Sequence, residues 1–92
     1  MSILAIETDK FEIRNVVCTD TDVIVMLADG RTITTPLWWY PRLLNATPQQ
    51  RTHWEIAGAG RGIHWPEVDE DLSIAGMLRG SKAPGAQEPA HV

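Results

Sequence analysis

The hydrophobic and polar positions in the first part of the chain predict three short strands. Residues 11–18 have a mixed pattern that ends in Val-Val-Cys, and residues 23–28 form a continuous apolar run. Residues 31–35, rich in Thr and Ile, form the third strand. Because Asp29-Gly30 is a dipeptide favoured in type I′ hairpin turns, we expect the second and third strands to pair antiparallel. The pattern therefore predicts a three-stranded antiparallel meander with the apolar run in the middle.

This central strand is apolar on both faces. Val23, Val25 and Leu27 share one face, and Ile24 and Met26 share the other. Strands that are apolar on both faces are usually central strands with a layer on either side. We therefore expect this strand to be covered on both faces.

Turn and helix-capping residues replace this pattern in the second part of the chain. Residues 37–44 fit one short helical piece that is bent at Pro41. A second helix is expected over residues 47–57, ended by Gly58. Its start combines a cap residue, a proline at the first helical position and a glutamine that completes a capping box: Thr47, Pro48 and Gln50.

The remaining elements are short. Residues 59–62 form a Gly-rich connector, and residues 62–65 suit a short extra strand. Residues 69–78 contain a small helix, with Asp71 or Ser73 near its cap. The fold class predicted is α+β, a three-stranded antiparallel meander packed against two or three short helices.

A chain of 92 residues is long enough for one small domain. We assign residues 1–80 to a single α+β domain and expect residues 81–92, which lack periodicity, to be a flexible tail. Residues 2–6 suggest an additional edge strand.

The charge balance argues against nucleic acids as partners. The formal net charge is −4, and the eight Lys and Arg residues are scattered, whereas DNA- and RNA-binding proteins present a basic stripe. No apolar run is long enough to span a bilayer, and the start of the chain lacks the basic segment of a signal peptide. The single cysteine cannot form an intramolecular disulfide. We therefore expect a cytoplasmic protein without membrane or nucleic-acid partners.

Patterns that could carry chemistry have simpler structural interpretations. Residues 58–62 do not have the spacing of a phosphate-binding loop. His64 with Asp69, Glu70 and Asp71 could suggest a metal, but carboxylates are also typical of a helix N-terminus. No motif supplies a nucleophile with a base. We expect no enzyme activity and no catalytic, cofactor-binding or metal residues.

We call Asp69, Glu70 and Asp71 the acidic corner. Two arginines, Arg42 and Arg51, are suited to pair with it. A guanidinium can bind a carboxylate through two parallel hydrogen bonds. We expect Arg42 to contact the acidic corner or Glu67. The alternative is that Arg42 packs its stem on Trp39 or Tyr40 and keeps its head in water.

Three adjacent aromatic residues, Trp38, Trp39 and Tyr40, form what we call the aromatic corner. One short helix cannot bury three consecutive side chains, so at least one ring should be partly exposed. Exposed Trp and Tyr often carry a large share of binding energy, although a small protein can also leave part of a large ring in water. Trp54 and Trp65 are predicted core residues.

The order of these motifs resembles a known family. The motifs are Asp29-Gly30-Arg31, the segments 36–43 and 46–51, and the segment 62–72. Between residues 11 and 80 the chain is similar to the bacterial family called domain of unknown function 2442. The family has no assigned reaction. Similar domains occur fused to helix-turn-helix regulators, and others resemble one member of a toxin–antitoxin-like pair.

The resulting hypothesis is a small non-catalytic protein-interaction domain, antitoxin-like or an accessory to a second small protein. Its partner would be a basic protein, and the chain could also form a homo-oligomer. The partner-binding residues would be Trp38, Trp39, Tyr40, Arg42, Asp69, Glu70 and Asp71. The alternative is a regulatory domain that binds a small ligand beside Trp38, Arg42 and Trp65.

Overall fold

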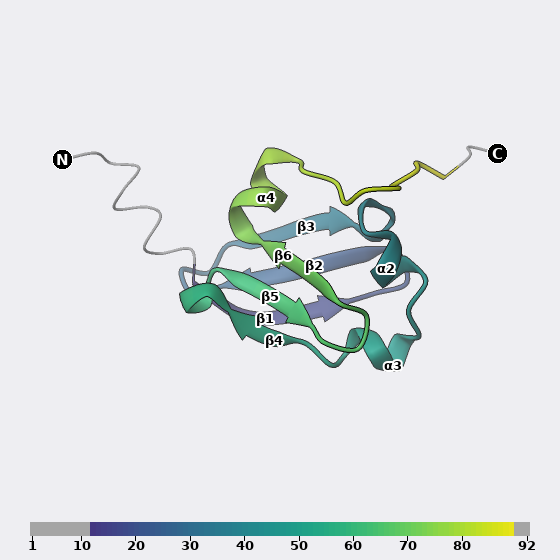
Figure 1. Ribbon diagram of the computed structural model, residues 1–92. Helices are drawn as coiled ribbons and strands as arrows, with labels where there is room; N and C mark the ends of the chain where they lie inside the picture. Colours follow the sequence, from purple (N-terminus) through teal and green to yellow (C-terminus); the bar gives the residue numbers. More distant parts are fainter. Residues whose placement is uncertain (1–11, 90–92) are drawn as a thin grey trace.

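Two antiparallel sheets of three strands each are packed face to face in the computed structural model, which describes residues 12–89 (Figure 1). The strand orders are β1-β2-β3 and β4-β5-β6. Short helices lie beside the sheets, so the architecture is α+β as predicted. The edge strand suggested for residues 2–6 lies outside the described residues.

The first sheet is the predicted meander. It consists of β1 (Ile13–Cys18), β2 (Asp22–Leu27) and β3 (Thr32–Pro36), and β2 lies in the middle. The register pairs Val23 with Cys18 on one side and with Thr35 on the other. The sequence prediction of the pairing and of the central strand is confirmed.

The turn between β2 and β3 differs from the predicted type I′ turn. That turn requires a positive φ at both central residues, but Gly30 has a φ of 94° while Asp29 is not in this region. The loop has three residues, because the Leu27 N–H donates to the Arg31 carbonyl at 2.8 Å and the Gly30 N–H donates to the Leu27 carbonyl. The Asp29 carboxylate accepts the Arg31 N–H at 3.0 Å, which stabilises the longer loop.

The central strand is covered fully on one face only. Val23, Val25 and Leu27 are buried against the second sheet, whereas Ile24 and Met26 on the outer face are half-buried. The expected cover on both faces is therefore wrong for the described residues. Thr32 and Thr34 of β3 pair with Met26 and Ile24 and line the same outer face, where both threonines are exposed.

The second sheet covers the inner face of the first. Its strands are β4 (Glu55–Ala57), β5 (Gly62–Trp65) and β6 (Glu70–Ser73). β5 confirms the predicted extra strand. The turn η2 (Gly58–Gly60) joins two strands rather than a helix and a strand.

The helix predicted over residues 47–57 is much shorter. The helix α3 (Pro48–Arg51) has the predicted capping box on Thr47, but it ends at Thr52. The segment that follows pairs as β4 with β5, so backbone bonds to a neighbouring strand replace helical bonds. Tertiary pairing here overrides the local pattern.

Three further helical segments complete the fold. The 3₁₀ turn η1 (Leu37–Trp39) and the helix α2 (Pro41–Leu44) form the predicted bent piece, broken at Pro41. The helix α4 (Ile74–Arg79) starts at Ser73, whose hydroxyl accepts the Gly76 N–H at 3.0 Å. Ser73, and not Asp71, is therefore the cap.

Trp65 lies at the centre of the core between the two sheets. Its ring is fully buried, and its Nε1–H donates to the Arg51 carbonyl at 3.1 Å. Trp54 is half-buried and packs against this core. Within residues 12–89, no helix has the length and apolar character needed to cross a membrane.

The chain beyond α4 runs over the aromatic corner. Gly80 ends α4 in a left-handed conformation with a φ of 77°. The Ala83 N–H then donates to the Trp39 carbonyl at 2.9 Å, and Ala83 packs against the core. The flexibility expected of residues 81–92 stays a prediction.

Candidate functional site

The aromatic corner is partly exposed. Tyr40 is buried, and its hydroxyl donates to Thr35 Oγ1 at 3.0 Å, whereas Trp38 and Trp39 are half-buried. The two indole rings are 6.4 Å apart at 81°, and Trp39 is 6.3 Å from Tyr40 at 73°. Such edge-to-face contacts fix the rings relative to one another. The expectation that at least one ring would be partly exposed is confirmed.

One tryptophan of this corner is held by the C-terminal segment. The Lys82 ammonium lies 4.7 Å from the centre of the Trp39 ring, a cation–π contact. Together with the hydrogen bond from Ala83, this contact places residues 82–83 along one side of Trp39. Trp38 is therefore the ring of the corner more open to a partner.

Arg42 contacts the acidic corner as predicted. Its Nη1–H donates to the backbone carbonyl of Asp69 at 2.6 Å, and the same nitrogen is 3.7 Å from Asp69 Oδ2. The side chains of Arg42 and Asp69 are 62% and 87% exposed, so water screens the ionic part of the contact. The contact connects α2 to the tip of the β5–β6 hairpin.

Arg51 does not contact the acidic corner. Its guanidinium is buried and donates to the carbonyls of Leu43 and Leu44, each at 2.9 Å, and lies 3.9 Å from Asp20 Oδ1. The last carbonyls of a helix lack intrahelical partners, and Arg51 supplies donors to those of α2. The expectation of an acidic partner in that corner is wrong, because α3 turns Arg51 toward α2.

The three acidic residues of the corner point in different directions. Alternation along β6 sends Asp71 outward, where its carboxylate lies 2.7 Å from His64 Nδ1, and sends Glu70 inward. Asp69 lies in the exposed turn with a φ of 53°. Among residues 12–89, no three His, Cys, Asp or Glu side chains are grouped to hold a metal ion.

Glu70 is the acidic residue with unusual surroundings. It is only 9% exposed, and one carboxylate oxygen accepts the Asp71 N–H at 3.0 Å. Burial raises the pKa of Glu70, while the hydrogen bond from Asp71 and the charge of Arg42 oppose that rise. The sequence indicated an acidic cluster but not the inward side chain, which β6 alternation could have identified.

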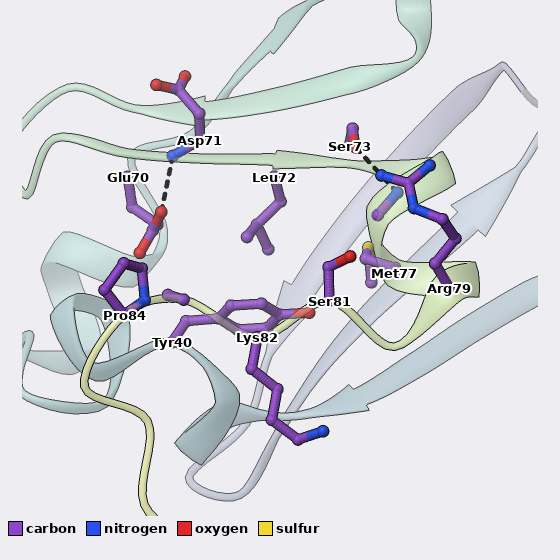
Figure 2. Close-up of a pocket in the computed structure, with 12 residues that line it drawn as sticks. Tyr40, Glu70, Asp71, Leu72, Ser73, Met77, Arg79, Ser81, Lys82 and Pro84 are labelled. Atoms are coloured by element: carbon purple, nitrogen blue, oxygen red, sulfur yellow. Dashed lines mark hydrogen bonds between the residues drawn. The ribbon is translucent and has the colours of Figure 1, made fainter.

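Glu70 lies at the edge of a pocket between β6, α4 and residues 81–84 (Figure 2). The pocket has a volume of about 280 Å³ and is lined by apolar and charged side chains. A smaller hollow of about 120 Å³ lies beside Pro41 and Arg42. Both contain Glu70, Ala83 and Pro84 in their walls, so the two hollows adjoin at these residues.

Comparison with known proteins gives a family and related folds. The model of the family described as protein of unknown function (DUF2442) matches residues 13–83. No curated protein matches the chain. The crystal structure of a protein of unknown function from Rhodospirillum rubrum has a TM-score of 0.68 and 31% identity, with 82% of this chain and 93% of that one covered. The solution structure of an uncharacterized protein from Chromobacterium violaceum has a TM-score of 0.71 and 23% identity, with 89% and 77% covered, and shows the same fold.

Proposed function

Because this chain belongs to the DUF2442 family, which carries no activity in its description, we propose its function from its surface: a small, non-catalytic domain that binds a second protein. The observations that carry the proposal are the partly exposed Trp38 of η1 and, in the next helix, the exposed contact of Arg42 with Asp69. Aromatic and arginine side chains are enriched among residues that dominate binding energy. The face would therefore present an apolar centre with a charged rim.

Charge favours a basic partner. The chain has a net charge of −4, and the side chains of Asp69 and Asp71 are 87% and 72% exposed near the tip of the second sheet. Complementary charge speeds encounter and disfavours like-charged partners. An antitoxin-like or accessory protein of the cytoplasm would use these carboxylates to cover a basic surface. Without its partner, the chain would self-associate through the same face.

Two residues suggested by the sequence take no direct part in this proposal. Tyr40 and Glu70 are buried, so they would support the exposed residues of this face from inside the fold. The ligand-binding alternative also loses one of its three residues, because Trp65 has no exposed surface to offer a ligand.

Trp38→Glu tests the proposal. Protein captured from the native cell by the wild-type chain is purified, and its affinity for both chains is measured by calorimetry. Loss of a central aromatic should weaken binding by roughly 30-fold or more, because such residues are worth about 2 kcal/mol or above. Circular dichroism should show an unchanged fold, since Trp38 is not part of the buried core.

Ile56→Glu is the matched control. Ile56 is 43% exposed on β4 and accepts the same charge change away from the aromatic corner. It should bind as the wild type does. If Trp38→Glu binds as tightly as Ile56→Glu, the interaction face lies elsewhere and the proposal for this corner fails.

A further inference from the structure

The pocket of Figure 2 carries opposite charges at its two ends. Glu70 lies at one end beside Pro84, and Arg79 lies at the other end beside Ser73. Leu72 lies between them. The pocket therefore joins an acidic end and a basic end through an apolar middle, to which Met77 also contributes.

The carboxylate at the acidic end makes no ion pair. Glu70 is 9% exposed, and within residues 12–89 no basic group lies within ion-pair distance of its carboxylate. The charge of Arg42 acts on Glu70 without forming an ion pair, because Arg42 uses Nη1 for the Asp69 carbonyl at 2.6 Å. A buried carboxylate without an ion pair costs free energy, and an ammonium group entering the pocket would supply a direct countercharge.

The basic end is suited to a carboxylate. Arg79 lies in the last turn of α4 and is exposed, so its guanidinium is free to reorient and can bind a carboxylate through two hydrogen bonds. The hydroxyls of Ser73 and Ser81 in the same wall can add donors. Lys82 contributes its stem to the wall, while its ammonium lies against Trp39.

From this geometry we infer that the pocket binds an ω-amino acid group, an ammonium and a carboxylate joined by a short chain of methylenes. Glu70 takes the ammonium, Arg79 takes the carboxylate, and Leu72 and Met77 contact the methylenes. A volume of about 280 Å³ accommodates a molecule of this size. The same chemistry occurs in free ω-amino acids and in the C-terminal lysine of a polypeptide. This binding is separate from the interaction proposed for Trp38.

Thermal melts and calorimetry with ε-aminocaproate test the inference on the full chain. The compound should raise the melting temperature saturably, since a ligand of the folded state stabilises it by mass action. Hexylamine and hexanoate each carry one of the two charges and should bind roughly tenfold more weakly or worse. If ε-aminocaproate does not raise the melting temperature, or if the one-charge compounds bind equally well, the inference is wrong.

Two variants assign the ends of the pocket. Glu70→Gln should weaken the binding of ε-aminocaproate by roughly tenfold and leave the binding of hexanoate unchanged. Arg79→Gln should leave the binding of hexylamine unchanged. Glu55→Gln and Arg14→Gln, which change exposed residues on other strands, are the matched controls and should bind as the wild type does. Equal binding by all four variants would overturn the assignment of Glu70 and Arg79.

A peptide that ends in lysine distinguishes the two sources of the ligand. If the free peptide binds and its C-terminal amide does not, the natural ligand is a polypeptide end. If ε-aminocaproate binds and neither peptide does, the ligand is a free ω-amino acid. Because Trp38 does not line the pocket, Trp38→Glu should leave ε-aminocaproate binding intact, so failure of the protein interaction and failure of this inference are measured separately.

Discussion

The two sheets differ in what holds their strands in place. In the first sheet, β2 buries alternate residues along its whole length, and each neighbour is joined to it by a short turn. In the second sheet, all three residues of β4 are exposed, so this strand is held by its backbone bonds to β5. The first sheet therefore follows from local sequence, whereas the second depends on packing against a fold already present.

Trp65 connects the two sheets, so its removal should have the largest effect. Trp65→Ala leaves a cavity in the centre of the core and should cost about 3–5 kcal/mol in the free energy of unfolding. Urea unfolding monitored by circular dichroism measures the loss. Hydrogen exchange of the variant shows whether the sheet of β4–β6 depends on the core. If this sheet stays as protected from exchange as in the wild type, that dependence is contradicted.

The turn of the first sheet should show the next largest effect. Gly30 has a φ of 94°, and a Cβ atom there meets nothing within 4 Å, so the main effect of Gly30→Val is backbone strain. Strain of this kind costs about 1–3 kcal/mol. Thermal unfolding gives the difference from the wild type.

Gly58→Val makes the same change in the second sheet. A Cβ atom at Gly58 also meets nothing within 4 Å, but the φ of 56° lies within the left-handed region that L residues can enter. The loss should therefore be smaller than for Gly30→Val. An equal or larger loss would mean that the turn of the second sheet determines its pairing as firmly as the turn of the first.

A pH series addresses Glu70, which faces inward from the second sheet. Its folded-state pKa is raised above the ordinary value of 4.5, mainly by burial. Because the folded state then binds the proton more tightly than the unfolded state, the stability contributed by Glu70 is present below 4.5 and is lost as the pH rises through the folded pKa. Glu70→Gln should therefore be more stable than the wild type near neutral pH.

Melting temperatures measured across the acidic to neutral range give the size of this gain. The gain should fade as the pH falls below 4.5, the ordinary value for the carboxyl group. Glu55→Gln on the exposed β4 controls for the loss of one negative charge. A gain that grows toward acid pH would show that Glu70 stabilises the fold as a carboxylate.

The contact between Arg42 and Asp69 should have the smallest effect. Both side chains are mostly exposed, and exposed ion pairs contribute about 0.2–1 kcal/mol. A double-mutant cycle of Arg42→Ala and Asp69→Ala, followed by thermal unfolding, should give a coupling at the low end of that range. The Asp69 backbone carbonyl stays in the second variant, so the cycle measures only the carboxylate. A coupling above that range would show that α2 and the second sheet are joined more firmly than water exposure allows.

The sequence predicted the features that depend on neighbouring residues. The hairpin at Gly30, the capping box at Thr47 and the break at Pro41 all rest on local backbone preferences. It did not predict β4, because Glu55–Ala57 has no buried residue and pairs only through its backbone.

The candidate site also has features that local sequence predicted and features that depend on tertiary packing. Adjacency was enough to predict that at least one ring of the aromatic corner would be partly exposed, and a contact of Arg42 with the acidic corner or Glu67 was also expected. The role of Arg51 depends on where α3 lies relative to α2, which local sequence does not determine. The pocket at Glu70 needs β6, α4 and the C-terminal segment together.

The difference in burial between Trp65 and the other three tryptophans gives the protein built-in optical labels. Indole emission shifts to shorter wavelengths in apolar surroundings, so the fully buried Trp65 should dominate the blue edge of the spectrum. Trp38, Trp39 and Trp54 are half-buried and should respond to soluble quenchers and to any molecule that binds over them. One spectrum thus separates events at the surface from the opening of the interior, without any dye attached to the chain.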